Sequence, residues 1–143
     1  MKITKHSWVT WCGGIRDGQG AISTVSGALK EYPYGFASRF EDRPGSSPEE
    51  LIAAAHASCF TMALSLILGD AGLTAAFLET SAQVGLEQTD DGFEITAVHL
   101  DLKERVPDTD QGAFETMATR AKSSCPVSKL IKAEITLVAT LVP

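Results

Sequence analysis

The sequence lacks the features that several classes of protein require. It has no run of Lys and Arg, and its net charge of −6 argues against a basic face that could neutralise nucleic-acid phosphates. It has no low-complexity tract, internal repeat or linker, so we predict a single domain over residues 1–143, long enough to bury roughly two thirds of its unfolded surface. The N-terminus lacks the apolar core of a secretory signal, which makes the cytoplasm the expected location.

Cysteine is scarce, and its pattern argues against several metal and redox sites. The chain has only Cys12, Cys59 and Cys125. Three cysteines cannot all pair within one chain, and none has the C-x-x-C spacing of zinc ribbons and thioredoxin sites. We therefore expect a reducing, intracellular compartment in which any disulfide is transient.

The longest apolar stretch, residues 51–68, raises the question of a membrane-spanning helix. Its interruptions are polar or small side chains, namely His56, Ser58, Cys59, Thr61 and Ser65. Acidic residues flank both ends, and no second span follows. We therefore predict a helix that is buried on nearly every side within a globular protein.

Turn signals and hydrophobic periods divide the chain into strands and helices. Strand patterns cover residues 6–11, 20–26, 76–86, 93–106 and 134–142, and helical patterns cover residues 47–68, 110–124 and 126–132. Prolines and glycines are concentrated in residues 27–46, where we expect an irregular and functional loop. The predicted class is α+β, with antiparallel strands around a long buried helix.

The long helix has several independent start signals. Ser47 can cap it, a proline suits its first turn, and Glu49 and Glu50 favour the positive end of the helix. Glycine is a frequent C-terminal stop, so we expect the helix to end at Gly69 or Gly72.

Cys59 lies in the middle of this apolar helix, and two interpretations are open. A lone cysteine among alanines is usually a small buried hydrophobe, and burial raises the pKa of a thiol. A reactive thiolate needs a nearby cation, and Arg39 in the preceding loop is the candidate. At about 4 Å and an effective dielectric constant of about 20, its charge lowers the pKa by at most about three units.

Cys125 begins the short helical pattern just before Pro126. As the N-cap residue it is expected to face free backbone N–H groups, with Lys122 and Lys129 adding positive potential. On this basis Cys125 is the easier thiolate, although a capping thiol without chemistry is the alternative. The residues alone do not decide which cysteine attacks first.

Other polar residues have simpler interpretations. Cys12 lies beside a glycine-rich turn and is expected to be an incidental surface thiol. His56 is favoured as a core histidine over a general base, and no cluster supplies the further ligands of a His–Cys metal site. By themselves, Glu49 is an ordinary first-turn acid and Arg39 is a solvated loop charge.

Several segments resemble the osmotically inducible protein C and organic hydroperoxide resistance (OsmC/Ohr) family of peroxidases. They are P-Y-G-F at 33–36, R-F-E at 39–41, P-E-E-L-I-A-A-A-H-A-S-C-F at 48–60, M-A-L-S-L at 62–66, C-P-V-S at 125–128 and K-A-E-I-T-L at 132–137. Together they extend over nearly the whole chain. The position of the arginine after P-Y-G-F resembles the osmotically inducible branch.

The resemblance implies a fold, an activity and roles for four residues. Family members form an α+β intertwined homodimer, in which antiparallel sheets wrap two long central helices. They reduce organic hydroperoxides, and hydrogen peroxide more weakly, without haem, flavin or metal. By this resemblance Cys59 is the peroxidatic cysteine, Cys125 is the resolving cysteine, Arg39 stabilises the thiolate and Glu49 orients the arginine.

The sequence is therefore interpreted as that of a cytoplasmic thiol peroxidase. A Cys59 sulfenate would condense with Cys125 to a disulfide, which an external dithiol such as a lipoyl group would reduce. The alternative is a non-enzymatic stress protein that binds a small apolar ligand or senses redox state. No nucleic acid, membrane or bound cofactor is expected.

Overall fold

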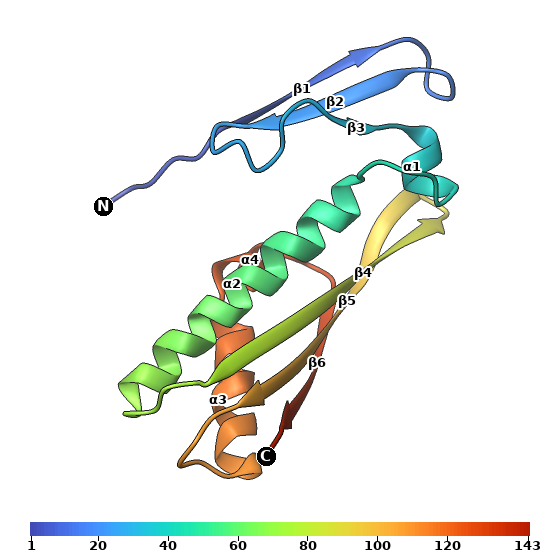
Figure 1. Cartoon of the computed structure of the whole chain (residues 1–143). Helices are drawn as coiled ribbons and strands as arrows, with labels where there is room; N and C mark the ends of the chain where they lie inside the picture. The colour runs from blue at the N-terminus through green and yellow to red at the C-terminus, as the bar shows by residue number, and fades with distance from the viewer. The chain divides into compact units, whose positions relative to one another are not determined.

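The computed structural model describes residues 1–143, and their contacts divide the chain into two compact units. Unit 1 covers Met1–Leu51 and unit 2 covers Ile52–Pro143. Figure 1 labels the helices and strands of both units. The α+β class predicted from the sequence is confirmed, with two three-stranded sheets and four helices.

Unit 1 is a small antiparallel sheet followed by a short helix. Its elements are β1 (Ser7–Cys12), β2 (Gln19–Thr24), β3 (Tyr32–Tyr34) and α1 (Phe36–Phe40). The strand order is β1-β2-β3, so β3 forms one edge. The first two strands were expected from the sequence and lie within one or two residues of the predicted bounds.

The loop predicted over residues 27–46 is not wholly irregular, because it contains β3 and α1. Pro33 lacks an N–H and is tolerated at a sheet edge, which is where β3 lies. Ser38 Oγ accepts a hydrogen bond from the Gly35 N–H (2.9 Å) and donates one to the Ser46 carbonyl (2.7 Å). Such local bonds leave no helical or strand period in the sequence, which is why the pattern predicted only a loop.

Helix α2 covers Pro48–Asp70, begins in unit 1 and continues in unit 2. Its predicted start is confirmed by the Glu50 N–H, which donates to the Ser47 Oγ over 3.2 Å. Its predicted stop is also confirmed. Gly72 has φ +74°, a conformation that glycine adopts without strain, and its N–H donates to the Gly69 carbonyl.

Only one side of α2 is buried in the single chain. The buried side chains of its middle and end are His56, Phe60, Leu64, Ile67 and Leu68. Met62 and Leu66 are 78% and 67% exposed. The prediction that α2 is buried on nearly every side is therefore wrong for a single chain. By length and composition alone, α2 is also long and apolar enough to cross a membrane.

Unit 2 combines the rest of α2 with a sheet and two further helices. Its elements are β4 (Phe77–Thr89), β5 (Gly92–Arg105), α3 (Gln111–Ser124), α4 (Pro126–Leu130) and β6 (Glu134–Leu141). β4 and β5 form the predicted antiparallel hairpin, but β6 pairs with β5 in parallel. This corrects the all-antiparallel prediction. The helical segment between β5 and β6 returns the chain to the starting end of the sheet, so β6 runs in the same direction as β5.

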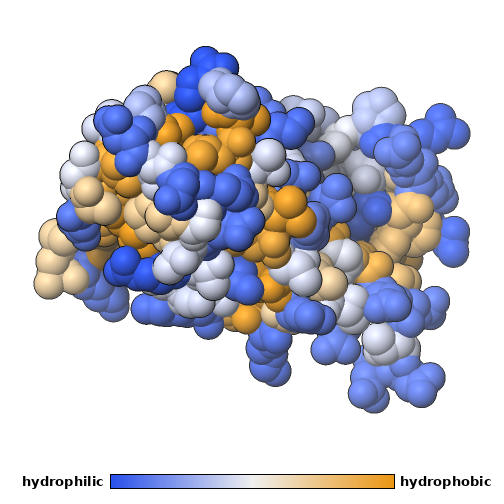
Figure 2. Space-filling view, turned by 90° about the horizontal axis from the view of Figure 1, so that it is seen from below, coloured by the Kyte–Doolittle hydropathy of each residue, from blue (hydrophilic) through white to orange (hydrophobic).

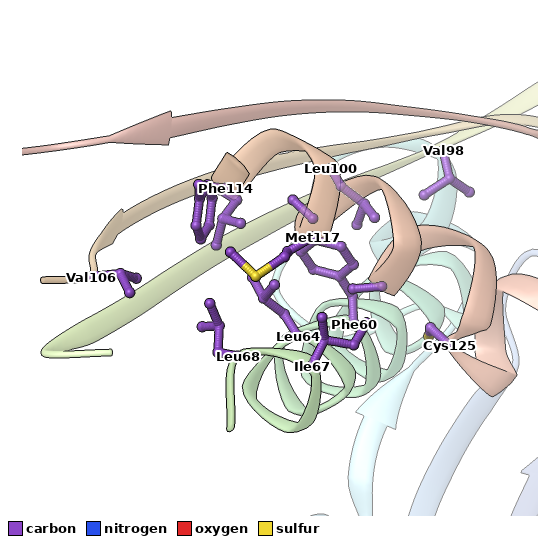
Figure 3. Packing of buried hydrophobic residues seen from close by; sticks show 13 residues of the cluster. Phe60, Leu64, Ile67, Leu68, Val98, Leu100, Val106, Phe114, Met117 and Cys125 are labelled. Atoms are coloured by element: carbon purple, nitrogen blue, oxygen red, sulfur yellow. The ribbon is translucent and has the colours of Figure 1, made fainter. Parts of the chain in front are cut away.

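The core of unit 2 lies between α2, α3 and one face of the sheet. Figure 3 shows Phe60 and Leu64 of α2, Phe114 and Met117 of α3 and Leu100 of β5 clustered together. The predicted helical spacing on α3 is confirmed by this packing. Each fully buried Leu or Phe side chain stabilises the fold by about 1.5–3 kcal/mol relative to an exposed one.

Apolar side chains also reach the surface. Figure 2 shows one face of the molecule, on which apolar patches interrupt a largely hydrophilic surface. Exposed large side chains of unit 1 include Trp8 and Val9, and β1 has no buried residue. Single exposed apolar residues are common, whereas apolar exposure along a whole strand and along one side of α2 is unusual for a folded monomer.

Candidate active site

Cys59 and Cys125 lie together in unit 2, although they are far apart in the sequence. Cys59 is half-buried in the middle of α2, whereas Cys125 is fully buried between α3 and α4. Both thiols are free, Cys59 packs against the core cluster that includes Cys125, and the Cys125 thiol is near enough to affect the pKa of Cys59. The fold therefore brings together the two thiols that the family resemblance implied as a reacting pair.

The contacts of Cys59 act in both directions on its protonation. Burial raises the pKa of the Cys59 thiol, and the neighbouring Cys125 thiol raises it further, whereas the backbone N–H of Val127 lowers it. The net effect is a raised pKa. Because a neutral thiol is a poor nucleophile, Cys59 needs a further positive group to react near neutral pH.

The N-terminus of α4 serves a different cysteine from the one predicted. Cys125 is the N-cap residue and Pro126 begins the helix, as expected. The Cys125 side chain, however, makes no capping hydrogen bond and packs in the apolar core. A thiol is a weak acceptor, so apolar packing prevails, and the Val127 N–H acts on Cys59 instead. Lys122, which was expected to add positive potential at Cys125, donates a hydrogen bond to the Ile135 carbonyl (3.3 Å).

A hollow of about 780 Å³ opens beside Cys59. Its apolar lining includes Met62, Ala63, Leu66, Ile67 and Pro126. Such a volume is within the range of roughly 300–1,000 Å³ that small-molecule sites occupy. The half-buried thiol is therefore accessible from a largely apolar surface.

Arg39 and Glu49 form an ion pair in unit 1. Arg39 Nη2 lies 2.6 Å from Glu49 Oε1, and Arg39 Nε lies 3.2 Å from each carboxylate oxygen. The Glu49 side chain is only 11% exposed, whereas the Arg39 side chain is 36% exposed. The contact that the resemblance implied is thus present, and the Nη1 group of Arg39 takes no part in it.

His56 is a core histidine, as predicted. It is fully buried, and its Nε2 lies 2.8 Å from the Ser128 Oγ. Its Nδ1 has no hydrogen-bond partner. Burial lowers the pKa of His56, so the ring is neutral at neutral pH. Cys12 is exposed, in agreement with its predicted surface position.

Three polar groups of unit 2 were missed by reasoning from the sequence: the Val127 backbone N–H, the Ser128 hydroxyl and the Glu104 carboxyl group. Val127 and Ser128 lie inside the C-P-V-S segment, of which only the cysteine and the proline were interpreted from the sequence. Glu104 is fully buried, with neither carboxylate oxygen hydrogen-bonded. Its inward position between Leu102 and Val106 at period two could have revealed it. No group of three or more His, Cys, Asp or Glu side chains could hold a metal ion.

Comparisons with known proteins match the chain to one family. Residues 40–139 match the OsmC-like protein family. The chain is 50% identical to Peroxiredoxin OsmC of Escherichia coli over 137 residues, which cover 96% of each chain. It is 34% identical over 92 residues to organic hydroperoxide resistance protein-like 2 of Staphylococcus epidermidis, covering 63% of each chain.

A solved structure extends the comparison to the fold. The organic hydroperoxide resistance protein OhrB of Bacillus subtilis is 25% identical and superposes with a TM-score of 0.70. The match covers 94% of this chain and 98% of that one. On this evidence, the chain belongs to the OsmC family of peroxidase-related proteins.

Proposed function

We propose that the protein is a cysteine-based thiol peroxidase that reduces organic hydroperoxides, and hydrogen peroxide more weakly. The observation that carries the proposal is the contact of the Cys59 and Cys125 thiols beside an apolar hollow. A thiolate at this position meets substrates that enter along an apolar surface. The names of the similar proteins, peroxiredoxin and organic hydroperoxide resistance protein, support the same class of reaction.

The proposed reaction has three steps. The Cys59 thiolate attacks the distal peroxide oxygen, the O–O bond breaks, and the leaving alkoxide takes a proton to become an alcohol. Cys59 is then a sulfenic acid. Cys125 attacks the Cys59 sulfur, so an S–S bond forms, the S–O bond breaks and water leaves. An external dithiol, such as a lipoyl group, reduces the disulfide and is itself oxidised.

Arg39 is proposed to supply the positive group that Cys59 needs. The guanidinium is held on one edge by Glu49, so its Nη1 group is free to donate to the thiolate and to the peroxide. Because Glu49 offsets part of the positive charge, the arginine acts chiefly through directed hydrogen bonds. Its effect on the Cys59 pKa is then below the ceiling of about three units.

The site is proposed to be composite, with Arg39 and Glu49 reaching Cys59 from the other subunit of a homodimer. Glu49 and Cys59 both lie on α2, ten residues apart. At about 1.5 Å per residue they are about 15 Å apart along the axis, and their directions differ by about 80°. An antiparallel crossing of two α2 helices would bring the start of one near the middle of the other, twice by symmetry.

The exposed apolar surface supports this dimer. β1 is exposed throughout, including Trp8 and Val9, which do not line the hollow at Cys59. A second chain that covers them would remove apolar area from water at about 25 cal/mol per Å². We place the dimer in the cytoplasm, where dithiol reductants keep both cysteines available for the next cycle.

A turnover assay tests the proposal against a non-enzymatic alternative. The apolar hollow at Cys59 would also suit a stress protein that binds a small ligand and senses redox state. Purified protein with excess dithiol and cumene hydroperoxide should consume many equivalents of peroxide. A sensor would stop after about one equivalent, because each thiol pair is oxidised once. Consumption that stops there contradicts the proposed enzyme.

A further inference from the structure

We propose that His56 and Ser128 form a positioning pair, whose hydrogen bond holds the first turn of α4 against α2 and so presents Val127 and Cys125 to Cys59. This inference rests on the peroxidase reaction proposed above. It assigns a task to two buried polar residues that the reaction itself does not use.

The position of the pair in the fold is the first argument. His56 precedes Cys59 by three residues, about one turn of α2, and Ser128 follows Val127 directly. The Nε2–Oγ bond of 2.8 Å therefore lies beside the interaction between the Val127 N–H and Cys59. A shift of α4 along α2 would break both interactions together.

The hydrogen-bond inventory of the pair is the second argument. His56 is fully buried and Ser128 is 8% exposed, so water cannot replace a lost partner freely. The Nδ1 atom of His56 has no partner, which leaves the Ser128 hydroxyl as the hydrogen bond that orients the ring. Loss of this bond would leave both ring nitrogens buried without a partner, a costly state. The fold therefore strongly favours one placement of α4.

The chemistry of the two steps is the third argument. The Val127 N–H is the contact that lowers the pKa of Cys59, so its alignment favours the thiolate. The second step requires the Cys125 sulfur to attack the Cys59 sulfur within the narrow geometry of a disulfide, with Cα atoms about 4.4–6.8 Å apart. Since Cys125 is the N-cap residue of α4, whatever holds α4 also sets the approach of this sulfur.

Removal of one hydroxyl tests the pair. Ser128→Ala deletes the bond, Ser128→Thr keeps a hydroxyl as the rescuing variant, and Ser123→Ala removes an exposed hydroxyl of α3 as the matched control. The first readout is the apparent pKa of Cys59, followed by thiolate absorbance against pH without any peroxide. The second is the rate of disulfide formation after one equivalent of cumene hydroperoxide, with the sulfenic acid trapped by dimedone.

We expect Ser128→Ala to raise the Cys59 pKa and to slow disulfide formation about fivefold to tenfold, so that trapped sulfenic acid accumulates. Ser128→Thr and Ser123→Ala should retain the wild-type values. A Ser128→Ala protein that is less stable, but has an unchanged Cys59 pKa and an unchanged condensation rate, overturns the positioning role. If Ser128→Ala does not fold, Ser128→Val is compared with Ser128→Thr by the same two readouts, since the two side chains have the same shape and valine has a methyl group where threonine has the hydroxyl.

These outcomes separate the pair from the peroxidase proposal. The pKa measurement requires no catalysis, so it reports on the pair even when turnover is absent. If wild-type Cys59 is not oxidised by the peroxide, the proposed function fails. If wild-type protein forms the disulfide and Ser128→Ala forms it equally fast with the same pKa, only the positioning pair fails.

Discussion

The two compact units hold complementary parts of the proposed reaction. Unit 2 carries the two thiols, whose contacts leave the pKa of Cys59 raised. Unit 1 carries Arg39 in a close ion pair with Glu49, and its only cysteine, Cys12, is exposed. Unit 2 therefore holds both thiols, with Cys59 shifted toward its neutral form, and unit 1 holds an arginine that is already paired and oriented. Each part is incomplete by itself.

The largest expected effect comes from removal of the thiol half. Cys59→Ser should abolish peroxide turnover, because serine is not ionised near neutral pH and forms no sulfenic acid. Cys125→Ser should still reduce about one equivalent of peroxide and then accumulate sulfenic acid, since the first step needs only Cys59. Peroxide consumption and mass spectrometry of the reacted protein check both outcomes.

The control for these variants is Cys12→Ser, which should leave turnover unchanged because Cys12 is exposed and far from both reacting thiols in sequence. A disulfide that includes Cys12, or full turnover by Cys125→Ser, would show that the two thiols of unit 2 are not the working pair.

The second effect comes from removal of the cation half. Arg39→Ala should raise the apparent pKa of Cys59 and slow peroxide reduction about a hundredfold or more, because a directed donor to the reacting atoms is lost. Thiolate absorbance against pH and the rate of the first step measure these changes. Arg43 follows α1, which carries Arg39, and its side chain is exposed, so Arg43→Ala is the matched control. An unchanged titration of Cys59 would mean that Arg39 is only a surface charge.

Complementation tests whether the two halves meet across a dimer. Heterodimers of a Cys59→Ser subunit and a Glu49→Ala subunit should recover about half of the wild-type turnover, because one of the two symmetric sites then has both an intact thiol and an intact glutamate. An Arg39→Ala/Cys59→Ser subunit mixed with Glu49→Ala should stay inactive. Heterodimers of the first kind that form but remain inactive would contradict the composite site.

The sequence predicted the helices and strands that carry the candidate residues better than it predicted the contacts around those residues. The caps and periods of α2, α3 and β5 depend on neighbours in the chain, so Ser47, Gly72 and the buried side chains of α3 followed from the pattern. The parallel pairing of β6 and the partner of the Val127 N–H depend on contacts between distant segments. Local propensity carries no information on such contacts, which is why helix α4 was expected to serve Cys125 and serves Cys59 instead.

The smallest expected effect concerns the buried acids, because the buried acid of unit 1 is paired with an arginine and that of unit 2 is not. Glu49 has an arginine partner, whereas Glu104 is fully buried between the cross-strand leucines Leu78 and Leu141. Burial raises the pKa of Glu104 to about 7. Because the folded state favours the protonated acid, stability is greatest below the ordinary pKa and falls as the pH rises toward 7. Between pH 5 and 8 the contribution of Glu104 to the free energy of unfolding should fall by about 2–3 kcal/mol.

Glu104→Gln should remove this contribution, because the amide does not ionise. Denaturant unfolding at pH 5 and pH 8 measures the difference between wild type and variant. The free energy of unfolding of the variant minus that of wild type should be about 2–3 kcal/mol larger at pH 8 than at pH 5. Glu87→Gln, on the exposed side of β4, is the control and should leave the pH dependence as in wild type. If wild type and Glu104→Gln show the same pH dependence, Glu104 ionises without penalty. The lack of an ion-pair partner at Glu104, in contrast to Glu49, would then have no effect on how stability depends on pH.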